Sequence, residues 1–171
     1  MENKKYKVLI VGCGNMGALN DAPSSGNEHK VISYAHALKE REDVFETYID
    51  DIDTDKIVEA CKIWDVKDND DFIEENILNR TEYEYDVIII AIPDSFHYEE
   101  LKRIALYYKP KLVICEKPLC STVAEANLAS SGQFLNRSLF FEAPTMSIGE
   151  DNKSRLFVFF SDIASASNCI S

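Results

Sequence analysis

The chain has 171 residues, 46% of them hydrophobic, and a formal net charge of −12. This length allows one substantial core with a small appendage, and two full domains would be crowded. The acidic charge and the lack of a concentrated basic patch argue against nucleic acid as a partner. No apolar run is long enough to span a bilayer and the N-terminus lacks a hydrophobic signal stretch, so we expect a cytoplasmic protein without a membrane partner.

The cysteines predict neither a metal site nor a redox pair. Their number is odd and none of their spacings forms a C-x-x-C motif, which favours reduced and mostly buried thiols. The five are Cys13, Cys61, Cys115, Cys120 and Cys169.

From the N-terminus onward, short apolar segments typical of strands alternate with segments whose apolar residues have helical spacing. The first strand is expected at 6–11 with a helix after it, and the next elements are a helix at 31–38, a strand at 44–49, helices at 54–63 and 70–78, a strand at 86–92, a helix at 98–107 and a strand at 111–115. This rhythm predicts an α/β fold of the Rossmann type, a doubly wound and mostly parallel sheet with right-handed crossovers.

The texture of the sequence changes after about residue 127. Serine becomes frequent, helical periodicity fades, and short runs at 138–143 and 155–160 predict two further strands. We therefore expect a dinucleotide-binding domain at 1–127. Residues 128–171 are either a tail or the incomplete start of a substrate domain, because they are too few for a domain of ordinary size.

A glycine motif follows the first predicted strand. Gly12, Gly14 and Gly17 match G-x-G-x-x-G, in which the glycines provide a tight turn, close approach of a pyrophosphate and close packing of the helix on the sheet. Together with Asn15 and Met16 they are the expected pyrophosphate contacts. Methyltransferases that bind S-adenosylmethionine also have a glycine-rich turn here, so the motif by itself leaves both ligands open.

An acidic residue at the end of the second strand should bind the adenosine ribose. Asp50 and Asp51 lie there, and we prefer Asp51. A carboxylate at this position favours NAD and repels the 2′-phosphate of NADP, and Ile52 adds no compensating positive charge. The alternative role, capping the helix that begins near Thr54, suits Asp53 better.

The spacing of this acid predicts an insertion. Asp51 follows Gly17 by 34 residues, whereas the usual distance is about 20. Residues 20–30 have the composition of a loop and interrupt the stretch where one helix would normally run. Two interpretations stay open, a flap over the nucleotide or substrate and a plain surface loop.

Two further stretches narrow the prediction to a family. They are Ala91-Ile92-Pro93-Asp94-Ser95-Phe96-His97, after the central strand, and Cys115-Glu116-Lys117-Pro118-Leu119, after the next strand. With the glycine motif, they resemble the Gfo/Idh/MocA family of oxidoreductases, named for glucose-fructose oxidoreductase and inositol dehydrogenase. The resemblance covers roughly residues 5–126, and Glu-Lys-Pro is its most specific part.

The resemblance implies an NAD cofactor and a set of site residues. Lys117 would lie beside the nicotinamide and the substrate hydroxyl, where a lysine can move or polarise a proton during hydride transfer. His97 resembles the family's histidine near the nicotinamide end of the cleft and is the second expected catalytic residue, although it could instead cap the following helix. Ile92, Pro93 and Glu116 are further expected cofactor contacts, as are His97 and Lys117 themselves.

The sequence departs from the family after these motifs. Family members continue into a second, largely antiparallel domain with an Asp-x-x-x-His element, and here no histidine follows His97. The expected catalytic set is therefore incomplete, as in a truncated or frame-disrupted enzyme, an isolated domain, or a chain that uses a dinucleotide differently.

Three functions compete. The first is the NAD-binding domain of a dehydrogenase acting on a secondary alcohol of a sugar, amino sugar or cyclitol. The second is a catalytically silent NAD-binding module, such as a sensor or assembly partner. The third, methyl transfer, leaves the Glu-Lys-Pro and Ile-Pro-x-x-x-His stretches unexplained. The expected partners are a dinucleotide and a sugar-like molecule, and the oligomeric state stays open, a homo-oligomer included.

Overall fold

The strands form one sheet of seven, in the order β3-β2-β1-β4-β5-β7-β6. The computed structural model describes residues 4–26, 30–70, 84–130, 139–142 and 157–160. The strands are β1 (Tyr6–Val11), β2 (Phe45–Asp50), β3 (Lys67–Asp68), β4 (Val87–Ile90), β5 (Leu112–Cys115), β6 (Leu139–Glu142) and β7 (Phe157–Phe160). The first five pair in parallel, and their 3-2-1-4-5 order confirms the predicted Rossmann-type topology.

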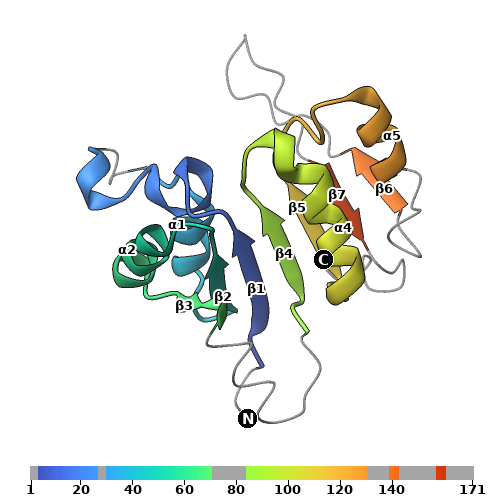
Figure 1. Ribbon diagram of the computed structural model, residues 1–171. Coiled ribbons are helices and arrows are strands. Elements are labelled where there is room, and N and C mark those ends of the chain that lie inside the picture. Colours follow the sequence, from blue (N-terminus) through green and yellow to red (C-terminus); the bar gives the residue numbers. More distant parts are fainter. Residues whose placement is uncertain (1–3, 27–29, 71–83, 131–138, 143–156, 161–171) are drawn as a thin grey trace.

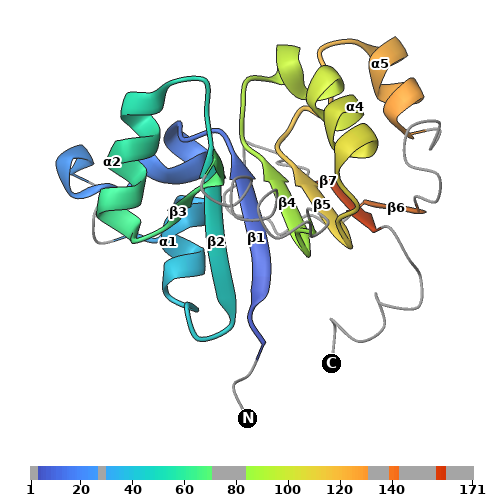
Figure 2. The same ribbon diagram turned by 60° about the horizontal axis from the view of Figure 1, so that its bottom comes forward.

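Helices lie on both faces of this sheet, which makes the fold doubly wound (Figure 1). The longer ones are α1 (Tyr34–Lys39), α2 (Thr54–Trp64), α4 (His97–Tyr107) and α5 (Val123–Ser130), and the short helical turns are η1 (Asn15–Leu19), η2 (Pro23–Ser25) and η3 (Asp94–Phe96). Figure 2 shows α1 and α2 beside β2, and α4 and α5 beside β4 and β5. Apart from its first residue, the helix expected at 70–78 lies outside the described residues.

Strand alternation divides the core between the two faces. In β1, Leu9 and Val11 pack on the side of α4 and α5, whereas Val8 and Ile10 pack on the side of α1 and α2. All four side chains are buried, as expected for a central strand covered by helices on both sides.

Both strands expected after residue 127 are present. β7 pairs with β5 in antiparallel register, with Leu112 opposite Phe160, and β6 pairs with β7. These two strands extend the parallel sheet at its β5 edge. The sheet is therefore mostly parallel, as expected, with an antiparallel end.

The helix expected at 31–38 begins later than the periodicity suggested. Val31 is exposed and precedes α1, so the expected start of this helix at residue 31 is wrong. Ser33 is the N-cap instead, and its hydroxyl accepts a hydrogen bond from the backbone N–H of His36. At α2 the expected cap is confirmed, because the Asp53 carboxylate accepts from the N–H of Asp55.

Asp21 anchors the insertion to α1. Its fully buried Oδ2 accepts from the N–H groups of Ile32 and Ser33 at 2.6 and 3.0 Å, and from Nδ1 of His36 at 2.9 Å. The His36 ring in turn stacks on Trp64, with 4.5 Å between ring centroids. At this end the 20–30 segment is therefore a buried anchor, and the interpretation as a plain surface loop fails there.

The Asp21 carboxylate is ionised because its partners outweigh its burial. Burial raises the pKa of Asp21, but the hydrogen bonds from Ser33, Ile32 and His36 lower it to about 2. A folded-state pKa below that of the unfolded chain means that the ionised group stabilises the fold.

We expect Asp21→Asn to lower the free energy of unfolding by about 2 kcal/mol at neutral pH, from a folded pKa of about 2 against about 4 in the unfolded chain. This contribution is fully present above pH 4 and is lost as the pH falls towards 2. Urea unfolding of both proteins between pH 7 and pH 2.5 measures it. A difference that stays constant over this range contradicts the assignment.

Candidate functional site

The ends of four parallel strands meet at one edge of the sheet, and backbone hydrogen bonds connect the loops that follow them. The N–H of Gly12 donates to the carbonyl of Asp50 at 2.7 Å. The N–H of Ala91 donates to Val11 at 2.8 Å, and that of Glu116 donates to Ile90 at 3.0 Å. The glycine motif and the two family motifs therefore lie together at the carboxyl edge, where open α/β sheets bind ligands.

Two of the three motif glycines are required by the fold. Gly12 has a φ of +105°, and a β-carbon on it would lie 2.6 Å from the carbonyl oxygen of Ala91. A β-carbon on Gly17 would lie 1.7 Å from the carbonyl oxygen of Gly12. These contacts match the tight turn and the close packing that the sequence predicted for the two positions.

Gly14 differs, because the protein itself gives no steric reason for a glycine there. Its φ of −66° suits any residue, and nothing lies within 4 Å of the position of an added β-carbon. Asn15 and Met16 follow as exposed residues at the start of η1, where first-turn N–H groups have no intrahelical partner. This open, donor-rich corner fits the pyrophosphate of a dinucleotide.

Asp50 and Asp51 point to opposite faces of the sheet. Asp51 turns towards the glycine motif, where its Oδ2 accepts from the N–H of Cys13 at 2.6 Å and its Oδ1 from the N–H of Asp53 at 2.9 Å. Asp50 lies on the α4 side with Tyr48, 3.3 Å from the guanidinium of Arg103. Burial raises the pKa of Asp50, and the charge of Arg103 opposes that rise.

The fold also brings an arginine close to this pair of acids, which the sequence neighbourhood did not suggest. This arginine, Arg103, pairs with Asp50, whereas the expectation of no compensating positive charge concerned Asp51 and Ile52. The guanidinium of Arg103 is occupied, because it also pairs with Glu100 at 2.7 Å and stacks over the ring of Tyr108 at 5.5 Å. These contacts hold it on the α4 side, whereas Asp51 faces the glycine motif.

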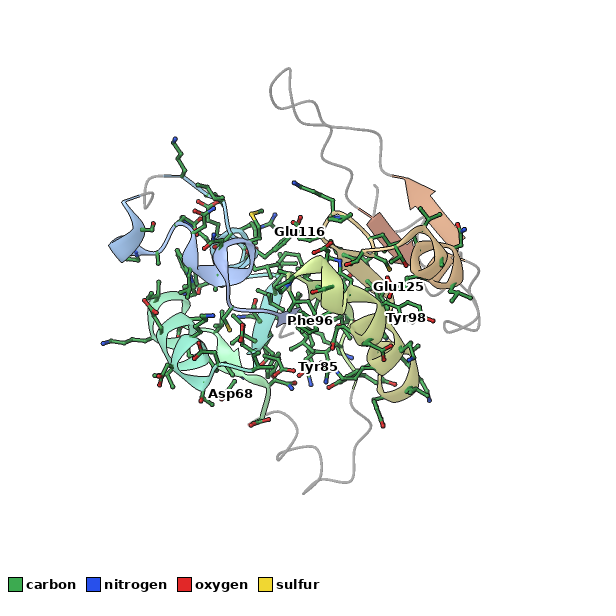
Figure 3. The ribbon with its side chains drawn as sticks, turned by 45° about the horizontal axis from the view of Figure 1, so that its top comes forward. Asp68, Tyr85, Phe96, Tyr98, Glu116 and Glu125 are labelled. Atoms are coloured by element: carbon green, nitrogen blue, oxygen red, sulfur yellow. The ribbon has the colours of Figure 1, made fainter. Side chains whose placement is uncertain are left out.

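Glu116 is held from across the strand edge. The hydroxyl of Tyr34, in α1, donates to Oε1 of Glu116 at 2.7 Å. Burial and this hydrogen bond both raise the pKa of Tyr34. Figure 3 shows Glu116 between the ribbon of the glycine motif and the end of β5. The sequence patterns indicated no role for Tyr34 in the site, and a hydroxyl among apolar neighbours was the one available signal.

Lys117 and His97 have contrasting surroundings. Lys117 is exposed, and among the described residues its ammonium has no ion-pair partner. His97 is 1% exposed and is the first residue of α4, whose N-cap is Phe96. The His97 ring contacts backbone carbonyls of other loops, at Ile92 and Pro118. The capping alternative is therefore wrong. Ile92 and Pro93 lie in the loop after β4, directly before η3.

Other kinds of site find no support in the part of the chain that the structure describes. No cluster of three His, Cys, Asp or Glu side chains there could hold a metal ion, and no described helix is long and apolar enough to cross a membrane. Cys13, Cys61, Cys115 and Cys120 are free thiols, three of them buried. Burial raises the pKa of Cys13, and the charge of Asp51 adds to that rise.

A separate groove of about 290 Å³ lies at the opposite end of β2, where Lys39, Phe45 and Trp64 are among its lining residues. Two of the lysines that line it are paired with neighbouring acids, Lys39 with Glu42 and Asp65, and Lys67 with Glu46. Neither the glycine motif nor the two family motifs reach it, so we place the functional site at the carboxyl edge.

Comparison with protein families identifies the class to which this chain belongs. The sequence profile described as "Oxidoreductase family, NAD-binding Rossmann fold" (GFO_IDH_MocA) matches residues 6–130. The chain belongs to this family, as the sequence motifs predicted. Comparison with curated protein sequences gives no match.

Solved structures of dehydrogenases share the fold at low sequence identity. The WlbA dehydrogenase from Chromobacterium violaceum, in complex with NADH and UDP-GlcNAcA, has a TM-score of 0.54 and 17% identity, over 82% of this chain and 35% of its own. Myo-inositol 2-dehydrogenase from Lactobacillus plantarum has a TM-score of 0.51 and 21% identity, over 75% of this chain and 32% of its own. The chain thus spans about a third of the length of these enzymes.

A methyltransferase fold is equally similar in shape. The TehB-like SAM-dependent methyltransferase from Corynebacterium glutamicum has a TM-score of 0.55 and 12% identity, over 94% of this chain and 82% of its own. Fold likeness therefore leaves both ligand classes possible, as the glycine motif did. The family match favours the oxidoreductase class over the methyltransferase class.

We expect Gly14→Val to abolish NADH binding and to leave the unfolding temperature nearly unchanged, because the side chain enters open space that the pyrophosphate would use. Gly17→Val should instead fail to fold stably, because its β-carbon would overlap the Gly12 carbonyl. NADH fluorescence titration and thermal unfolding measure the two effects. Retained binding by Gly14→Val would mean that the ligand sits elsewhere.

Proposed function

We propose that this chain is the NAD-binding part of a dehydrogenase that transfers hydride between nicotinamide and a secondary alcohol of a sugar, amino sugar or cyclitol. The observation that carries the proposal is the meeting of the glycine motif, Asp51 and the Glu116-Lys117 segment at one sheet edge. Family membership supports the cofactor class. The substrate class follows the similar structures, whose names give a UDP-sugar complex and an inositol dehydrogenase.

The cofactor's adenosine half would be held without any cationic side chain. Backbone N–H groups at Asn15 and Met16 would donate to the pyrophosphate across the open side of Gly14. Each oxygen of Asp51 already accepts one backbone N–H and keeps a lone pair for a ribose hydroxyl. Because Cys13 and Asp53 fix this carboxylate, the ribose would meet a preorganised acceptor.

The nicotinamide half would lie towards the loops after β4 and β5. Bound NAD supplies the hydride chemistry. Ile92 and Pro93 would pack against the cofactor, and Glu116, oriented by Tyr34, would accept from its second ribose. The exposed Lys117 would donate a hydrogen bond to the substrate oxygen and carry its proton as the alcohol and carbonyl interconvert.

A second candidate function is a catalytically silent NAD-binding module. Cofactor binding needs only the glycine motif and Asp51, and neither of these requires a substrate pocket. Both candidates predict dinucleotide binding, so turnover separates them.

We expect tighter binding of NADH than of NADPH, because the Asp51 carboxylate would repel a 2′-phosphate. Asp51→Ala should weaken this preference. Asp50→Ala is the matched control, since Asp50 faces the other side of the sheet and pairs with Arg103. Fluorescence titrations with both cofactors measure the preference. Equal or tighter NADPH binding by the unaltered chain contradicts the assignment.

The 171-residue polypeptide by itself should bind NADH without turning over sugars, amino sugars or inositols at a rate typical of dehydrogenases. Hydride transfer needs the substrate carbon held about 3 to 3.5 Å from the nicotinamide, and Lys117 marks only one side of that position. The NADH absorbance, followed with a substrate panel and NAD, should stay flat. Turnover that disappears in Lys117→Ala would show instead that this polypeptide completes the site.

A further inference from the structure

His97 lies between two loops and contacts backbone oxygens on both of its sides. Its Nε2 is 2.8 Å from the carbonyl oxygen of Ile92, in the loop after β4. Its Nδ1 is 2.9 Å from the carbonyl oxygen of Pro118 and 3.2 Å from that of Leu119, in the loop after β5. The ring thus connects the Ile-Pro-x-x-x-His stretch with the Glu-Lys-Pro stretch. Helix α4 and strand β5 separate the two in the sequence.

The chemistry of these contacts makes the ring a donor. A carbonyl oxygen only accepts, so each short contact requires a proton on the facing nitrogen. A neutral imidazole carries one N–H and can donate to the carbonyls of one loop. A ring with protons on both nitrogens can donate to the carbonyls of both loops. The thiol sulfur of Cys115 also lies near the ring, 3.4 Å from Nδ1. With 1% of its surface exposed, His97 presents no free nitrogen to a substrate.

We propose that His97 is a positioning residue that fixes the Lys117–Leu119 loop against the loop after β4, rather than a catalytic residue. The proposal rests on the proposed function, because it assigns the loop to the nicotinamide end of the site. Tyr34 holds Glu116 on one side of this loop, and His97 holds Pro118 and Leu119 on the other. The exposed Lys117 lies between these two attachments.

The test compares two ligands on the full 171-residue chain. NADH would contact both ends of the site, whereas AMP reaches only the glycine motif and Asp51. His97→Leu removes the N–H donor and fills the buried position with an apolar side chain. His97→Gln places an N–H donor there again. Leu106→Ala, an exposed position on the same helix, is the control for changes to α4.

We expect the His97→Leu variant to bind NADH about tenfold more weakly than the unaltered chain, because it loses a buried hydrogen bond to the loop. AMP affinity should change less than about twofold, since that half of the site is untouched. His97→Gln should recover most of the NADH affinity, and Leu106→Ala should match the unaltered chain. Unchanged NADH affinity, or equal losses for NADH and AMP, would overturn the proposal. Failure of the unaltered chain to bind either ligand would refute the proposed function instead.

A measurement on the unaltered chain covers the case in which His97→Leu does not fold. Nuclear magnetic resonance of the chain with ¹⁵N-labelled histidine reports which ring nitrogens carry protons. We expect a slowly exchanging ring N–H on His97, with contacts to Leu119 or Ile92. Freely exchanging ring protons on His97 would overturn the proposed positioning role of His97, whether or not NAD binds.

Discussion

The contact between Gly17 and the carbonyl oxygen of Gly12 is the constraint on which the site depends. A β-carbon at Gly17 would stand 1.7 Å from that oxygen, so η1 can approach the end of β1 this closely only with hydrogen at that position. In the same turn, Gly14 faces open space and the N–H of Cys13 donates to Asp51. The close approach of η1 to β1 therefore lies beside both the open side of Gly14 and the Asp51 carboxylate.

The other half of the site depends on a series of longer connections. Asp21 binds the N–H groups that lead into α1, and this fixes the start of the helix that carries Tyr34. Tyr34 then reaches Glu116 across the strand edge. The inserted segment thus contributes to the site through its anchor at Asp21, whatever the rest of the segment does. A segment for which the sequence left both a flap and a plain surface loop open helps to orient Glu116, an expected cofactor contact.

Local patterns were sufficient for much of this structure. Period-two alternation in β2 puts Tyr48 and Ile49 on opposite faces of the sheet. Asp50 and Asp51 continue this alternation, with Asp50 beside Arg103 and Asp51 beside the glycine motif. The alternation of strands and helices likewise predicted the parallel order. The two late strands were predicted as strands, but their place beside β5 was not, because nothing local specifies a pairing partner.

The contacts that sequence reasoning missed all join residues far apart in the chain. Tyr34 and Glu116 are 82 positions apart, and Arg103 and Asp50 are 53 apart. Side-chain periodicity shows which face a residue occupies and gives no partner on another element. His97 was a candidate by motif, yet only the fold shows that its ring turns inwards onto backbone carbonyls.

Mapping backbone amide shifts on titration with NADH tests directly whether the carboxyl edge of this sheet binds a dinucleotide. We expect the perturbed amides to gather at residues 12–17, at Asp51 and at residues 116–119, and the groove beside Lys39 and Trp64 to stay unperturbed. Perturbations concentrated in that groove, or none at saturating NADH, would contradict binding at the carboxyl edge.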